Sequence, residues 1–86
     1  MEKIKVLIAD DIRILRQGLK AVLSADTQME VVALAENGKE AFEKCRVYQP
    51  DVVLMDIIMP KLDGLAVLDR VNHEPEMKKP AFIVIS

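Results

Sequence analysis

Residues 52–55 form an apolar run that ends in a single carboxylate, and this arrangement limits the possible folds more than any other feature. The run, VVLM, predicts a short strand over residues 52–56 that is buried on both faces, as in a parallel sheet. Pro60 cannot donate a hydrogen bond to a neighbouring strand and favours extended geometry at Met59, so the strand must end before Pro60. Asp56 is therefore expected at the carboxyl end of a buried strand, where ligands bind in open α/β sheets.

Strand-like and helix-like stretches alternate along the chain. Apolar runs predict strands over residues 6–9, 29–35, 52–56 and 81–85. Helical spacing of apolar residues predicts helices between them, over residues 14–23, 37–48 and 62–73. The alternation predicts one α/β domain, in which helices cover both faces of a parallel sheet.

Polar residues at the predicted helix starts suggest caps. We expect Asp11 to cap the first helix, where its charge suits the helix dipole. Asn37, with Glu40 three residues later, predicts a capping box at the second helix. The side chains expected to face inward from the second and third helices are Ala41, Phe42, Cys45, Leu65, Leu68 and Val71.

Charge and hydropathy exclude several classes of protein. The net charge of −2 comes from mixed acids and bases, so no basic patch predicts nucleic-acid binding. The apolar runs are far shorter than the roughly 20 residues that span a bilayer. The start of the chain lacks the apolar core of a signal peptide, and Cys45 is the only cysteine. We expect a cytoplasmic protein that contacts neither membrane nor nucleic acid.

Three aspartates follow two of the predicted strands. If the strands ending at Asp10–Asp11 and at Asp56 are neighbours, their carboxylates converge and repel one another. A hard divalent cation such as Mg²⁺ would relieve this repulsion, and Asp56 beside it would be a suitable nucleophile toward phosphorus. Structural explanations stay open: a helix cap for Asp11, a polar strand end for Asp10 and a turn for Asp56.

Three runs of the sequence resemble a known family. VLIADD from Val6, PDVVLMDIIMPKLDG from Pro50 and FIVIS from Phe82 resemble the receiver domain of bacterial two-component response regulators. The resemblance covers the whole chain. It implies a flavodoxin-like, three-layer α/β/α sheet with strand order 2-1-3-4, without the family's fifth strand and last two helices. Residues 1–86 are then expected to be an incomplete receiver domain with no output domain.

The same resemblance implies roles for individual residues. Asp56 would be the phosphoacceptor, and Mg²⁺ would be held by Asp10, Asp11, Asp56 and the backbone carbonyl of Ile58. The hydroxyl of Ser86 would contact the phosphoryl group, whereas no residue of the chain matches the family's lysine. A sensor histidine kinase or a phosphotransfer protein would be the partner, and the output would be transcriptional. The chain is expected to accept a phosphoryl group, not to be an enzyme with its own substrate.

Other functions remain as alternatives. A phosphatase would also use an aspartate nucleophile, but it commonly needs a second carboxylate where this chain has Ile58. A flavodoxin-like flavin or nucleotide binder would need glycines where Asp10 and Asp11 follow the first strand. A third alternative is a truncated receiver that does not switch and acts only through protein–protein contacts. It would form a homodimer or a domain swap through the fourth strand and the first helix.

Overall fold

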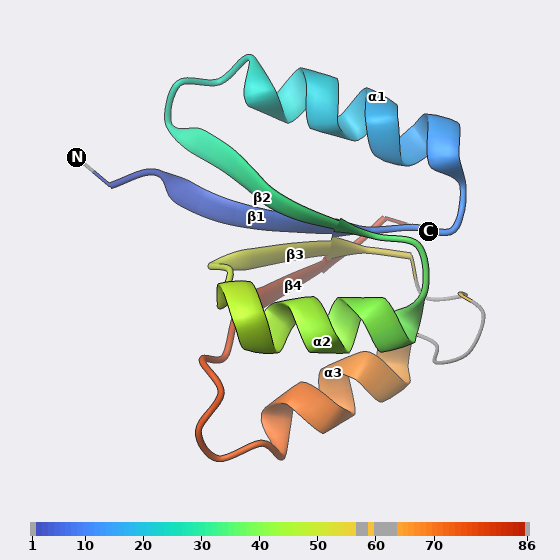
Figure 1. The fold of residues 1–86 in the computed structure, drawn as a ribbon, viewed down its shortest axis with the longest axis vertical. Coiled ribbons are helices and arrows are strands. Elements are labelled where there is room, and N and C mark those ends of the chain that lie inside the picture. The colour runs from blue at the N-terminus through green and yellow to red at the C-terminus, as the bar shows by residue number, and fades with distance from the viewer. Residues whose placement is uncertain (1, 57–58, 60–63, 86) are drawn as a thin grey trace.

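The computed structural model describes residues 2–56, 59 and 64–85 of the chain. In these residues strands and helices alternate, as the sequence predicts (Figure 1). In chain order they are β1 (Ile4–Ala9), α1 (Arg13–Ser24), β2 (Met29–Ala35), α2 (Gly38–Tyr48), β3 (Val52–Met55), α3 (Gly64–Asn72) and β4 (Ala81–Val84). None of these described helices is long and apolar enough to cross a membrane.

The described strands form one parallel sheet with the order β2-β1-β3-β4. β1 lies between β2 and β3, and Ala9 at its end is opposite both Ala35 and Met55. β4 pairs with the other side of β3. The α/β class and the predicted strand order 2-1-3-4 are thus confirmed. Because β1 and β3 are adjacent and end at the same level, the residues that follow them leave the sheet side by side.

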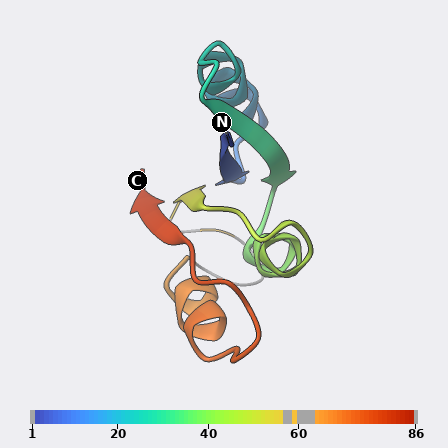
Figure 2. The same ribbon diagram turned by 90° about the vertical axis from the view of Figure 1, so that its left-hand side faces the viewer.

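Helices cover the sheet on its two faces. α1 lies on one face, and α2 and α3 lie next to each other on the opposite face (Figure 1). Figure 2 shows the same three layers from the side, with the sheet between α1 and the other two helices. This is the three-layer α/β/α arrangement that the sequence predicts.

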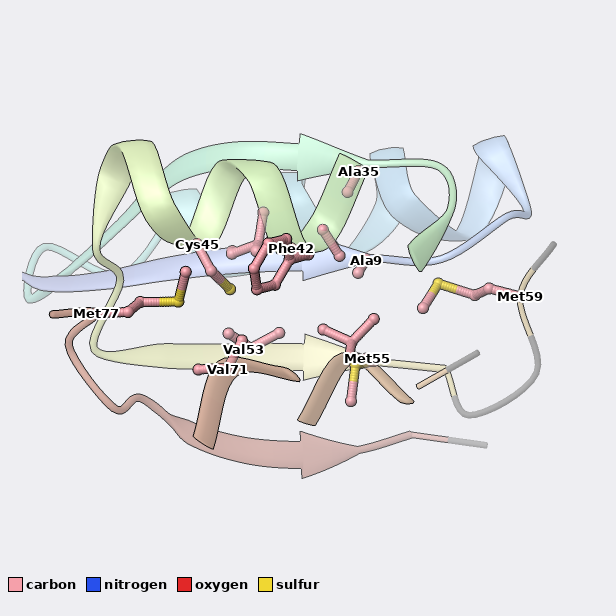
Figure 3. Packing of buried hydrophobic residues seen from close by; sticks show 12 residues of the cluster. Ala9, Ala35, Phe42, Cys45, Val53, Met55, Met59, Val71 and Met77 are labelled. Carbon is pink, nitrogen blue, oxygen red and sulfur yellow. The ribbon is translucent and has the colours of Figure 1, made fainter. Parts of the chain in front are cut away.

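The main core lies between the sheet and the two helices α2 and α3 (Figure 3). Alternate residues of β1 and β3 point into it, as the period of two in a strand requires. The sheet and α2 contribute Leu7, Ala9, Val53, Met55, Ala41, Phe42 and Cys45. The predicted inner face of the second helix is therefore confirmed. Burial raises the pKa of the Cys45 thiol to about 11, so this thiol stays protonated at neutral pH and serves packing.

The opposite face of the sheet is covered less completely. α1 contacts β1 and β2, while Val52 and Leu54 of β3 remain half-buried. An open apolar groove lies beside α1, and it is lined by Ile4, Val6, Leu23, Met29, Val52, Leu54 and Ile83. The prediction that the third strand is buried on both faces is wrong for this face, because α1 covers β1 and β2 and leaves β3 only half-buried.

The first helix is confirmed, but not all of the apolar residues whose spacing predicts it face the sheet. Ile14 and Val22 are 82% and 71% exposed, whereas Leu19 and Leu23 are half-buried. Arg16 shares their spacing and is only 9% exposed. The inner side of α1 therefore includes a charged residue. Most of β4 is also exposed, and self-association through α1 and β4 stays a prediction.

The two helix starts differ from each other in how they are capped. Asn37 caps α2 as predicted, since its Oδ1 accepts a hydrogen bond from the Glu40 N–H at 2.9 Å. The Glu40 carboxylate in turn accepts from the Glu36 N–H at 3.2 Å. The predicted Asp11 cap is wrong, because the residue at the cap position of α1 is Ile12 and no side chain caps this helix.

The third helix presents a different set of side chains to the core than the one predicted. Val67 and Val71 are fully buried and Leu68 is half-buried, but Leu65 is 62% exposed, so its predicted inward position is wrong. α3 packs against α2, and Val67 and Val71 share a core cluster with Val53 and Met55 of β3, so this packing selects the stripe that contains Val67. The predicted start of this helix, residues 62–63, lies outside the described residues.

Candidate functional site

The three aspartates singled out in the sequence meet at the carboxyl end of the sheet. Asp10 and Asp11 follow β1, and Asp56 follows β3. One carboxylate oxygen from each of the three lies within 4.8 Å of the corresponding oxygens of the other two. The predicted convergence is confirmed, and its cause is the pairing of β1 with β3. We call Asp10, Asp11 and Asp56 the acidic pocket.

Asp10 is the most constrained member of the acidic pocket. It is 0% exposed, and its N–H donates to the Ala35 carbonyl at 3.0 Å. Its carboxylate Oδ1 accepts from the Ile12 N–H at 2.8 Å, and its backbone carbonyl accepts from Arg16 Nη1 at 2.6 Å. A polar strand end explains these contacts, but it leaves carboxylate Oδ2 unexplained.

Asp10 Oδ2 is a buried acceptor with no hydrogen-bond partner. Burying such an atom without a partner costs free energy, and buried polar groups in native proteins are seldom left in this state. The Asp10 carboxylate to which this atom belongs lies close to the carboxylates of Asp11 and Asp56. A buried carboxylate oxygen without a partner, in a group of three carboxylates, is suited to be a ligand of a cation.

The other two members of the acidic pocket differ in their exposure to solvent. Asp56 is 8% exposed, and its N–H donates to the Ala9 carbonyl at 3.0 Å, which fixes it beside the end of β1. Asp11 is exposed. Exposure thus rises from Asp10 through Asp56 to Asp11, so Asp11 is the member of the group that lies toward solvent.

Charge in the acidic pocket contrasts with charge at the other end of the sheet. There Asp51 is hydrogen-bonded by the Lys78 ammonium group and by the Lys5 N–H, and these contacts lower the pKa of its carboxyl. In the acidic pocket, three carboxylates of like charge lie close together. A divalent cation bound among them would remove their mutual repulsion, so the residues present fit Mg²⁺, which prefers oxygen ligands.

Two predicted site residues cannot be compared with the structure. Ile58 and Ser86 lie outside the described residues, so their roles stay predictions. Ile85, the residue before Ser86, donates its N–H to the carbonyl of Met55 at 3.0 Å. Met55 directly precedes Asp56, so the described end of the chain lies beside the acidic pocket.

Arg16 is a site residue that the sequence prediction missed. It lies on α1 but hydrogen-bonds to Asp10 at the end of β1. Its spacing from Leu19 and Leu23 was the available signal, since residues 16, 19 and 23 recur on one side of a helix.

Comparison with known proteins identifies the chain. The family model described as "Response regulator receiver domain" matches residues 6–86. The chain belongs to the response regulator receiver family. The resemblance in the sequence is thereby confirmed. Membership of this family favours the receiver interpretation over a phosphatase or a flavin binder.

Individual members of the receiver family are similar in sequence and structure. The response regulator domain of Thermotoga maritima CheB is 37% identical, with a TM-score of 0.86 over 96% of this chain and 60% of that one. A protein-glutamate methylesterase/protein-glutamine glutaminase of Carboxydothermus hydrogenoformans is 46% identical over 87% of this chain. The transcriptional regulatory protein DegU of Brevibacillus brevis is 43% identical over 88% of it. The chain spans only 22% and 33% of these two curated relatives, so it matches a part of each.

Proposed function

We propose that this chain is a phosphoacceptor module of a bacterial two-component system and that it acts in the cytoplasm. It takes a phosphoryl group on Asp56 from a sensor histidine kinase or a phosphotransfer protein. The observation that carries the proposal is the Asp10 carboxylate, which gathers with those of Asp11 and Asp56 and has a buried Oδ2 without a hydrogen-bond partner.

Asp56 is the acceptor because of its position in the acidic pocket. Asp10 is fully buried and one of its carboxylate oxygens already accepts a hydrogen bond, so an incoming donor cannot reach it. Asp11 is exposed to solvent, which lowers the reactivity of its carboxylate. Asp56 lies between these extremes and is 8% exposed, so it is partly desolvated but still reaches solvent.

The proposed transfer is a displacement at phosphorus. A carboxylate oxygen of Asp56 attacks the phosphorus atom, and the new P–O bond gives an acyl phosphate. The bond from phosphorus to the nitrogen of the donor histidine breaks, and that nitrogen keeps the electron pair. Bound Mg²⁺ would stabilise the charge on the phosphoryl oxygens.

The proposed ligands of Mg²⁺ are Asp10 through Oδ2, Asp11, Asp56 and the backbone carbonyl of Ile58. Ser86 is proposed to contact the phosphoryl group through its hydroxyl. The hydrogen bond between Ile85 and Met55 supports the assignment of Ser86, because these two residues directly precede Ser86 and Asp56.

Phosphorylation of Asp56 replaces a carboxylate of charge −1 by an acyl phosphate of roughly −1.5 to −2, and this change biases the balance between two conformations. The proposed readout is an output domain that controls transcription, as the name of the similar DegU protein suggests. The similar methylesterase/glutaminase proteins favour a second candidate, in which the module controls an attached enzyme domain of that class.

Removal of the metal tests this function. With acetyl phosphate and Mg²⁺, we expect the intact mass of the protein to rise by one phosphoryl group. With EDTA in place of Mg²⁺, at the same ionic strength, the three carboxylates repel the anionic donor and we expect no measurable uptake. Equal uptake in EDTA, or no uptake in Mg²⁺, would contradict the proposal.

A further inference from the structure

We propose that Arg16 is a positioning residue of the acidic pocket, and that it fixes the Asp10–Asp11 peptide for cation binding. The inference rests on the proposed Mg²⁺ site. Arg16 lies on α1, is 9% exposed and donates from Nη1 to the Asp10 backbone carbonyl at 2.6 Å. It does not touch the reacting atoms, so it would act only through Asp10 and Asp11.

Arg16 donates its hydrogen bond to a backbone carbonyl and not to a carboxylate, which indicates that it positions the backbone and does not neutralise an acidic side chain. Among the described residues, Arg16 forms no salt bridge with a carboxylate. Its hydrogen bond goes to the main-chain carbonyl of Asp10, and the nearby carboxylate atom Asp10 Oδ2 is left without a partner. A guanidinium bound to Oδ2 would occupy the proposed ligand position. Arg16 instead holds the backbone and leaves that oxygen available to a cation.

The hydrogen bond from Arg16 has consequences for two ligands at once. The Asp10 carbonyl and the Asp11 nitrogen belong to one planar peptide unit, so fixing the carbonyl also fixes where Asp11 begins. The Asp10 N–H is held by Ala35 and its Oδ1 by the Ile12 N–H. Arg16 supplies the remaining backbone contact of this residue, and it ties the peptide to the first turns of α1 through its own N–H bond to Ile12.

If Arg16 is replaced, the loss of its charge and the loss of its hydrogen bond should change Mg²⁺ affinity in opposite directions. Arg16 is a cation near a cation site, so loss of its charge alone would strengthen Mg²⁺ binding. Loss of its hydrogen bond would instead loosen Asp10 and Asp11, and so weaken binding. Partners that orient metal ligands typically contribute ten- to a hundredfold to affinity, and since Arg16 acts through the backbone we expect about tenfold.

The test compares Arg16→Met and Arg16→Lys with the control Arg13→Met, which removes the same charge from an exposed position of α1. All variants are studied at a temperature at which circular dichroism shows them folded. The first readout needs no metal: hydrogen exchange of the Ile12 amide, which bonds to Asp10 Oδ1. The second is Mg²⁺ affinity, followed by titration with NMR detection.

In Arg16→Met we expect faster exchange of the Ile12 amide and about tenfold weaker Mg²⁺ binding. Arg16→Lys keeps the charge but lacks the planar fork, so its affinity should be intermediate. Arg13→Met should match the parent. Unchanged exchange of the Ile12 amide in Arg16→Met, or Mg²⁺ binding as tight as in the parent, overturns the inference. If the exchange changes but the parent itself does not bind Mg²⁺, the proposed function fails and the positioning of the peptide stands.

Discussion

Asp56→Asn is expected to abolish the uptake of a phosphoryl group from acetyl phosphate. The amide of asparagine has nearly the shape of the carboxylate, but it lacks the negative charge and the nucleophilic oxygen. Asp56 is 8% exposed and its backbone is held by Ala9, so the substitution leaves the ends of β1 and β3 in place. Intact mass measured in the presence of Mg²⁺ should show the unmodified chain alone.

The matched control for this substitution is Asp69→Asn on α3. The Asp69 side chain is 72% exposed and lies outside the acidic pocket, so this variant should take up a phosphoryl group as the parent does. Uptake by Asp56→Asn at the rate of the parent would mean that another group is the acceptor, and the proposed chemistry would be wrong.

Leu7→Ala is expected to have the largest effect on the free energy of unfolding. Leu7 is 0% exposed on the central strand β1, and it points into the core under α2 and α3. Truncating a leucine in such a site costs about 2–5 kcal/mol, because apolar burial is lost and a cavity remains. Small domains have roughly 5–15 kcal/mol of total stability, so the loss is a large fraction of it.

Urea unfolding followed by circular dichroism measures this effect. Val22→Ala on α1 is the control, since Val22 is 71% exposed and its truncation should change stability by no more than about 0.5 kcal/mol. A loss in Leu7→Ala no greater than in Val22→Ala would contradict the assignment of the core to the α2 and α3 face of the sheet.

Several features of the fold can be predicted from sequence because they depend on neighbours along the chain. The VVLM run before Asp56 predicts β3, and the spacing of Asn37 and Glu40 predicts the cap of α2. Both depend on contacts within a few residues. The adjacency of β1 and β3 depends on contacts between distant segments. It followed from the family resemblance, and periodicity alone did not supply it.

The errors arise where two local solutions are equally good. On the third helix, apolar residues at 65, 67, 68 and 71 allow more than one inner stripe, and the contact with α2 selects Val67 over Leu65. At the first helix, Asp11 is the predicted cap, but Ile12 occupies the cap position. The Asp10 side chain turns back to the Ile12 N–H, which leaves Asp11 exposed in the acidic pocket.

Arg16 was missed for a related reason. A charged residue on a helix is normally assigned to the solvent side, since burial of a charge without a partner is costly. Here the partner is the backbone carbonyl of Asp10, which follows a strand, whereas Arg16 lies on a helix. A pattern of side chains does not predict a hydrogen bond to a backbone carbonyl in another element. The acidic pocket itself was predictable, but its supporting contacts were not.

Chemical mapping of the modified residue tests the central claim most directly. Borohydride reduces an acyl phosphate to an alcohol, which converts the modified aspartate to homoserine. The protein is treated with acetyl phosphate and Mg²⁺, reduced, digested and sequenced by mass spectrometry. We predict homoserine at position 56 and aspartate at positions 10 and 11. Homoserine at position 10 or 11, or aspartate at position 56 in a chain that has gained a phosphoryl group, would contradict the account.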